Sequence, residues 1–171
     1  MNPRQILRGR LYAAGLVLAL VVPFLVTLGL TGACSASSTA SKEPVGQVSH
    51  SHRIVFQVNS EDPTTMKHAI SNTLNAIRNY NEKNEPVAVE IVAYGPGIHM
   101  FRDDTSPVKG LLQFLHTTHP DVVFSVCGNT KMIMEKNEGR TVPLVDGVQV
   151  VPFGVVRLVE LQEAGWSYLR P

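Results

Sequence analysis

Cysteine is scarce in this sequence, because its 171 residues include only Cys34 and Cys127. Two cysteines cannot build the disulfide framework of a small secreted scaffold, and there is no Cys-x-x-Cys pair for dithiol redox chemistry. If Cys34 belongs to a processed N-terminal segment, Cys127 is the single thiol of the folded part. It is then either an inert residue that packs as a small hydrophobe or a reactive group.

Charge is also missing from a long stretch near the N-terminus. Arg4, Arg8 and Arg10 precede an almost wholly apolar run, and no charged residue occurs between Leu11 and Ser41. This order is typical of an export signal, and the run has the roughly 20 residues that cross a bilayer. We therefore predict an export signal or membrane anchor over residues 1–34. The arginines would stay in the cytoplasm, which places the domain in the periplasm or anchored facing it.

The end of this segment leaves its processing open. The stretch Leu30-Thr31-Gly32-Ala33-Cys34 resembles a bacterial lipoprotein site, which makes Cys34 a candidate for lipidation. Ordinary cleavage after one of the nearby alanines and an uncleaved anchor are the alternatives. Residues 35–52 are rich in Ser, Ala and Thr, and they are predicted to form a flexible tether to a domain at 53–171.

Basic residues do not outnumber acidic ones once the N-terminal segment is set aside. Three of the 15 lysines and arginines lie in it, so 12 remain against 14 acidic residues and leave a net charge of −2. A weakly acidic domain argues against nucleic-acid binding. His116 and His119 are too few for a structural zinc site, and the loop from Gly95 to His99 lacks the Lys and Ser or Thr of a phosphate-binding loop. We expect neither a metal nor a cofactor.

Strand-like and helix-like segments alternate along the domain. The apolar runs 53–58, 87–94, 122–126 and 148–151 are typical of strands, and 166–169 suits a short final one. Asp62 and Pro63 begin the first of the intervening helices. This alternation predicts a three-layer α/β domain with a mostly parallel sheet of about five strands. The strand order is left open.

Cys127 lies where the third predicted strand meets a helix that starts at Gly128. In an open α/β sheet, the carboxyl ends of the strands form the crevice in which ligands bind. The first amides of a helix favour negative charge and hence the thiolate, the reactive form of cysteine. Cys127 is therefore the candidate catalytic residue, and we expect an accessible, acidic thiol.

Three segments carry a family resemblance: residues 92–98, residues 124–130 with Cys-Gly-Asn-Thr, and residues 155–171 with the ending Leu-Gln-x-x-Gly-Trp-x-Tyr-x-x-Pro. With these segments in this order, residues 53–171 resemble the DsrE/DsrF-like family of sulfur-relay proteins. The resemblance implies a flavodoxin-like fold, assembly as a homo-oligomer of the trimer or hexamer kind, and sulfur carried as a persulfide on Cys127.

The residues around Cys127 are candidate binding residues. Gly95, Gly97 and His99 follow the neighbouring strand and are expected to form the opposite wall of the crevice. His99 either pairs with the thiolate or is simply solvated. Gly128, Asn129 and Thr130 open the helix, and Asn129 or Thr130 is expected to cap it.

Two functions agree with these features. The first is an exported single-cysteine sulfur-relay protein, a persulfide carrier or sulfurtransferase-like protein, with a donor or acceptor that is a protein or a small sulfur compound. The second is a non-catalytic oligomeric binding module of the same fold, in which Cys127 only packs. A dithiol oxidoreductase would need Cys127 to pair with Cys34 or with another chain.

Overall fold

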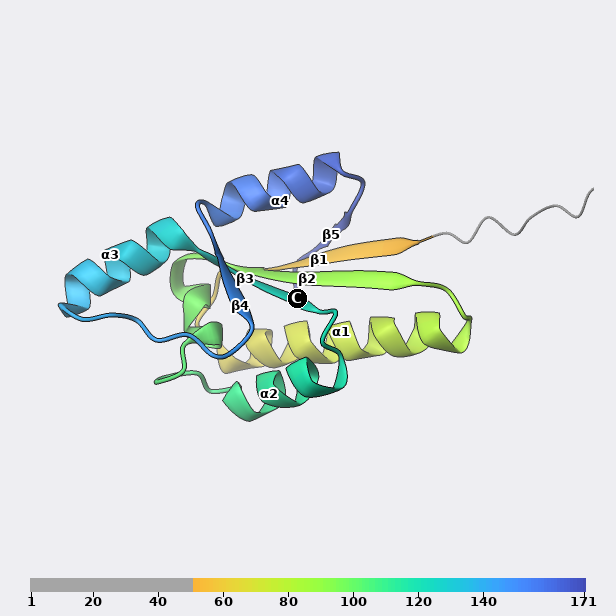
Figure 1. Ribbon diagram of the computed structural model, residues 1–171, viewed down its shortest axis with the longest axis horizontal. Helices are drawn as coiled ribbons and strands as arrows, with labels where there is room; N and C mark the ends of the chain where they lie inside the picture. The colour runs from red at the N-terminus through yellow and green to blue at the C-terminus, as the bar shows by residue number, and fades with distance from the viewer. Residues whose placement is uncertain (1–50) are drawn as a thin grey trace, which may run out of the picture. The chain divides into compact units, whose positions relative to one another are not determined.

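Five parallel strands form one sheet at the centre of the domain in the computed structural model, which describes residues 51–171 (Figure 1). Helices cover both faces of the sheet, so the expected three-layer, flavodoxin-like α/β fold is confirmed. The predicted export signal or anchor, Cys34 and the tether as far as residue 50 lie outside the described residues. Within residues 51–171, no helix has both the length and the apolar character that a membrane crossing requires.

The sheet order is β4-β3-β2-β1-β5, which the sequence alone had left open. The strands are β1 (His52–Val58), β2 (Val87–Ala93), β3 (Val123–Cys127), β4 (Val148–Val151) and β5 (Ser167–Leu169). The helices are α1 (Pro63–Glu82), the 3-10 helix η1 (Gly95–Phe101), α2 (Lys109–Thr118), α3 (Gly128–Glu138) and α4 (Gly154–Glu163). The sequence had predicted only a turn where η1 forms.

The first helix begins as predicted. Asp62 is the N-cap of α1, and its carboxylate accepts hydrogen bonds from the backbone N–H groups of Thr64 and Thr65, both at 3.1 Å. Pro63 follows in the first turn, where its missing N–H costs nothing.

One boundary differs from the expectation. His52, assigned to the tether by composition, is the first residue of β1 and pairs with Val87 of β2. Its ring stacks on Tyr80 with a centroid distance of 3.8 Å, and its Nε2 bonds to Glu85 Oε2 at 3.0 Å. These tertiary contacts, which local composition does not encode, extend the strand by one residue.

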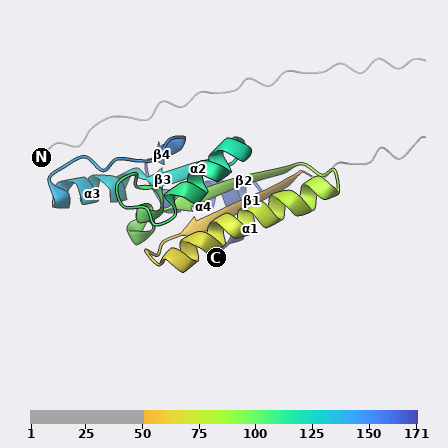
Figure 2. The same cartoon turned by 90° about the horizontal axis from the view of Figure 1, so that it is seen from below.

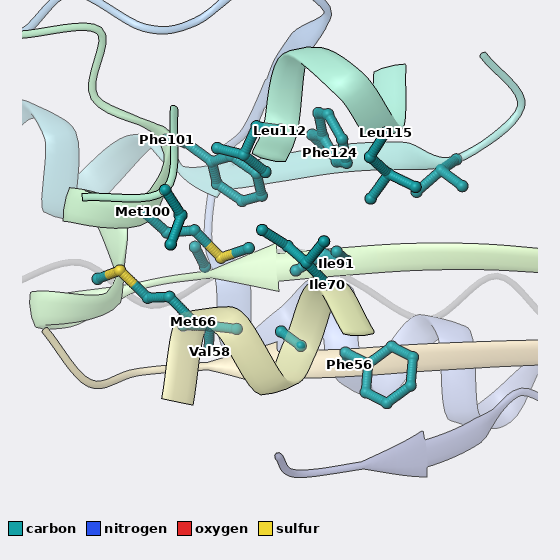
Figure 3. Packing of buried hydrophobic residues seen from close by; sticks show 14 of the residues in the cluster. Phe56, Val58, Met66, Ile70, Ile91, Met100, Phe101, Leu112, Leu115 and Phe124 are labelled. Atoms are coloured by element: carbon teal, nitrogen blue, oxygen red, sulfur yellow. The ribbon is translucent and has the colours of Figure 1, made fainter. Parts of the chain in front are cut away.

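The main core fills the layer between the sheet and the helices α1, α2 and η1 (Figure 3). Figure 2 shows α1 and α2 on the same side of the sheet, and the two helices contact each other. Aromatic rings from η1 and β3 meet in this core, where the ring centroids of Phe101 and Phe124 are 5.2 Å apart. Each fully buried side chain of this size contributes about 1.5–3 kcal/mol, so this layer gives the strand ends a firm support.

Of the helices within residues 51–171, α4 alone covers the opposite face, where it contacts β1, β2, β3 and β5 (Figure 1). Its apolar cluster is much smaller and consists of Val55, Val92, Leu158 and Leu161. The chain crosses the sheet in one direction from β1 to β4 and then returns through α4 to β5. Because crossovers are right-handed, this reversal sends α4 to the other face. The carboxyl ends of β3 and β4 therefore form the topological switch point, where ligands bind in such sheets.

Candidate functional site

Cys127 is the last residue of β3 and also the N-cap residue of α3, with an extended backbone at φ −70° and ψ 113°. The strand runs into the helix without a loop residue between them. The sulfur therefore takes the place that an Asp or Ser oxygen has at an ordinary N-cap. Asn129 and Thr130 are already inside the first turn, so the prediction that one of them caps the helix is wrong.

Several donors surround the sulfur and change its acidity. Burial raises the pKa of the Cys127 thiol, but the Thr130 hydroxyl and the backbone N–H groups of Gly154, Thr130 and Asn129 lower it, and the net result is a lowered pKa. These contacts are looser than an ordinary cap hydrogen bond, since no side-chain cap bond forms at α3. The N–H of Asn129 is also shared with the carbonyl oxygen of Pro152 at 3.2 Å. An acidic thiol was expected, and its cause is this ring of donors.

A second helix begins against the same sulfur. Gly154 opens α4, and a Cβ added to it would lie 3.2 Å from the Cβ of Cys127 and 3.1 Å from the Cβ of Tyr94. The N-cap residue of α4, Phe153, offers no side-chain oxygen to the first amides. The amino ends of α3 and α4 thus converge on one sulfur, and both favour its negative charge. The sequence-based reasoning missed Gly154, although Val151-Pro152-Phe153-Gly154 is a second strand-to-helix junction.

Thr130 links the sulfur to the loop after β2. The backbone N–H of Gly95 donates to Thr130 Oγ1 at 3.2 Å. Since that oxygen already accepts a hydrogen bond, its own proton is left for the sulfur. Gly95 has φ +52°, a conformation that favours glycine. Gly95 and Thr130, both predicted as binding residues, therefore contact each other, and Gly95 acts on the sulfur only through Thr130.

Two of the remaining predicted residues, Gly97 and Gly128, have packing roles. A Cβ on Gly97 would lie 2.1 Å from the carbonyl oxygen of Val58, and one on Gly128 would lie 3.1 Å from that of Val151. Glycine at both positions lets the chain pass close to a strand end. His99 Nδ1 bonds to Thr105 Oγ1 at 3.2 Å, so the structure pairs this histidine with a threonine of the segment that follows η1.

The thiol is less accessible than expected. Cys127 is 6% exposed, because the turn between β4 and α4 covers it. Cys127 does not line any of four clefts on the surface of residues 51–171. The one beside it has a volume of about 140 Å³ and is lined by Val151, Pro152, Phe153, Val156, Arg157 and Glu160. The expectation of an open thiol is therefore wrong for the single chain, and small reagents are favoured over large ones.

A buried polar network lies below the thiol on the α4 face. Glu90 is 1% exposed and accepts a hydrogen bond from Ser125 Oγ at 2.6 Å. Arg157 of α4 donates to both oxygens of the Glu90 carboxylate, from Nε at 2.9 Å and from Nη2 at 2.8 Å. Sequence reasoning missed this network. Its signal was a single carboxylate inside the apolar run of β2, because a buried charge requires a partner.

The fold and the site define a three-layer α/β protein with one acidic thiol at the switch point of a parallel sheet. No family model matches the chain, and no curated protein matches it. The solved structure of MTH1491 from Methanobacterium thermoautotrophicum, a protein of unknown function, is 35% identical with a TM-score of 0.57. The match covers 70% of this chain and 99% of that one. The solved structure of BT1422 from Bacteroides thetaiotaomicron, a conserved protein of unknown function, is 14% identical with a TM-score of 0.42, over 70% of this chain and 94% of that one.

The identity and coverage of the archaeal match show a common family, so this chain belongs to the family of MTH1491. Because that protein is itself described as being of unknown function, the chemistry must be argued from the site.

Proposed function

We propose that this protein is an exported sulfur-relay protein that carries a persulfide on Cys127 or transfers it in a sulfurtransferase-like reaction. The observation that carries the proposal is the thiol at the switch point, whose pKa is lowered by donors from two helix starts and from Thr130. The resemblance of residues 124–130 to sulfur-relay proteins supports it independently. The placement outside the cytoplasm rests on the sequence of residues 1–34.

The reaction needs only a nucleophilic thiolate and a donor with a sulfur–sulfur bond, such as inorganic polysulfide. The Cys127 thiolate attacks an outer sulfur of the polysulfide and forms a new S–S bond. The S–S bond inside the donor breaks, and its electron pair leaves with the shortened polysulfide. No outside oxidant or reductant is required.

Two further observations fit this chemistry. Cys127 is the one cysteine within residues 51–171, so no second thiol of the domain is present to convert the persulfide into a disulfide. Its 6% exposure favours a small anionic donor over a persulfide buried in another protein.

The test is a mass measurement on the full-length protein in a Cys34→Ser background, which leaves Cys127 as its sole thiol. After incubation with polysulfide, we expect a mass gain of one sulfur atom that dithiothreitol removes. The matched control, Cys34→Ser/Cys127→Ser, should gain none. Equal gain in the two proteins, or none in either, would exclude the sulfur-relay function.

A second candidate is an oligomeric binding module, and exposed apolar residues on the α4 side favour it. The side chains of Phe153, Val155, Val156 and Val159 are each 47–59% exposed. Val155 and Val159 are four residues apart, so they share one side of α4. Apolar surface of this kind marks interaction sites. We propose that it forms the contact of a homo-oligomer, of the trimer or hexamer kind.

Sedimentation of the full-length protein in detergent tests this assembly. Val155→Lys/Val159→Lys is expected to reduce the wild-type oligomer to a monomer, because two charges would be buried in the contact. Met132→Lys on α3 is the matched control, since Met132 is 59% exposed but lies on another helix. A monomeric wild-type protein would contradict the proposal.

A further inference from the structure

We propose that the ion pair between Glu90 and Arg157 is a positioning device that holds the first turn of α4 against the Cys127 sulfur and so sets how readily Cys127 reacts. The inference rests on the proposed role of Cys127 as the reactive thiol. Neither residue is placed in contact with the sulfur. Both act through the backbone of α4, which makes them positioning residues.

The first turn of α4 has little else to hold it in place. Val155 and Val156 are 59% and 47% exposed, so they do not anchor the helix to the sheet. The first buried apolar side chain of α4 after Gly154 is Leu158. Arg157 lies one turn after Gly154, and its two hydrogen bonds to Glu90 fix that turn to the middle of β2.

The pair is connected to the strand that carries the thiol through Ser125, which lies two residues before Cys127 on β3. Side chains alternate along a strand, so Ser125 and Cys127 lie on the same face of β3. Ser125 donates to Glu90 and accepts from Gln149 Nε2 of β4 at 2.8 Å. The network thus joins β2, β3, β4 and α4 one layer below the sulfur. A shift of α4 would break the two hydrogen bonds from Arg157 to Glu90, and it would also withdraw the Gly154 amide from Cys127.

The test is the pKa of Cys127, measured from the pH dependence of iodoacetamide alkylation in the full-length Cys34→Ser protein. Arg157→Met removes both hydrogen bonds of the pair, and Glu90→Gln removes its charge and one of its two acceptor oxygens. If the pair positions α4, both variants raise the pKa by about half a unit to one unit, which means about 3- to 10-fold less thiolate below the midpoint.

The sign in Glu90→Gln separates positioning from a direct effect of charge. Through charge alone, loss of the Arg157 cation would raise the pKa of Cys127, whereas loss of the Glu90 anion would lower it. Positioning predicts a rise in both variants. A lowered or unchanged pKa in Glu90→Gln would therefore overturn the inference.

Arg157→Lys provides a second measurement if the other variants fail to fold. Lysine keeps the positive charge but cannot form the bidentate pair with Glu90, because its ammonium group is a compact point charge. We expect about threefold less thiolate than in the Cys34→Ser parent, and an unchanged pKa would overturn the inference.

Two control variants are measured in the same way, one expected to leave the pKa of Cys127 unchanged and one expected to raise it. Glu160→Gln removes a carboxylate that is 58% exposed and 3.8 Å from Arg157, but it leaves both hydrogen bonds from Arg157 to Glu90 in place, so it should leave the pKa of Cys127 unchanged. Thr130→Val removes a direct donor to the sulfur and should raise it. The sulfur-relay function and the positioning role can fail separately. If the pKa of Cys127 rises in both variants but no sulfur adduct forms, only the sulfur-relay function is excluded. If the adduct forms but Glu90→Gln does not raise the pKa of Cys127, only the positioning role is excluded.

Discussion

Gly97→Ala is expected to destabilise the domain by about 3 kcal/mol or more, the cost of forcing extra volume into a rigid, well-packed place. The added Cβ would lie 2.1 Å from the carbonyl oxygen of Val58, 2.6 Å from its carbon and 2.9 Å from Cα of Asn59. These are backbone atoms at the end of β1, so no side chain can turn aside to make room. Either η1 or the end of β1 must move, and a movement of η1 would shift its first residue, Gly95, away from Thr130.

Urea denaturation of the full-length protein measures this effect, with Gly110→Ala as the matched control. A Cβ on Gly110 in α2 would have no heavy atom within 4 Å. Because alanine favours a helix over glycine, this control should stabilise the domain by about 0.5–1 kcal/mol. The same chemical change should thus have opposite signs at the two positions. Equal stability of the two variants would show that the close approach of η1 to β1 is not present in solution.

Arg102→Met is expected to cost about 3 kcal/mol, because it removes a buried cation from the centre of an ion cluster. Arg102 is 1% exposed, and its guanidinium donates to Asp104 at 2.9 and 2.8 Å. The same group donates to both oxygens of Glu138, the last residue of α3. Within α3 no residue is buried, so this cluster is a main attachment of its carboxyl end.

Arg140→Met is the control for the second prediction. Arg140 contacts the same two carboxylates but is 53% exposed, so its loss should cost less than about 1 kcal/mol. If the two arginine variants are equally stable in urea denaturation, the burial of Arg102 has no energetic role.

Acid provides an independent measure of the same cluster. Hydrogen bonds from Arg102 lower the pKa of Asp104 and Glu138 below their usual values of 3.8 and 4.5. A carboxylate with a lowered folded-state pKa adds stability above its unfolded pKa, and this stability is lost as the pH falls through the folded pKa. The wild type should therefore lose stability as the pH drops below about 4.5. Arg102→Met should show a shallower loss over the same pH range.

The α/β layout and the position of the reactive thiol were predictable because their signals are local. Apolar runs separated by helical stripes specify strands and helices, and Asp62 followed by Pro63 marks a helix start wherever it occurs. Cys127 was recognised because a buried strand followed by a polar, glycine-containing turn predicts a crevice position in any parallel sheet. Thr130 and Gly95 were identified as binding candidates, but the role of Thr130 as hydroxyl donor to Cys127 and that of Gly95 as support for Thr130 were not.

The contacts across the sheet were not predictable. Gly154 is 27 positions after Cys127 in the printed sequence, and only the return of the chain through α4 brings its amide to the sulfur. Glu90 gave a signal, a charge within an apolar strand, but not the identity of its partner Arg157. The burial of Cys127 was also missed, because it depends on the turn between β4 and α4, which covers the sulfur.

By itself, then, the sequence determined the element types, the parallel sheet and the single thiol at a strand end, since periodicity and turn residues act over a few neighbours. Tertiary structure alone decided the order β4-β3-β2-β1-β5, the convergence of two helix starts on Cys127 and the Glu90–Arg157 pair. The physical reason is that these features depend on which strands become neighbours and on which face each helix packs, and residues far apart in the chain settle both.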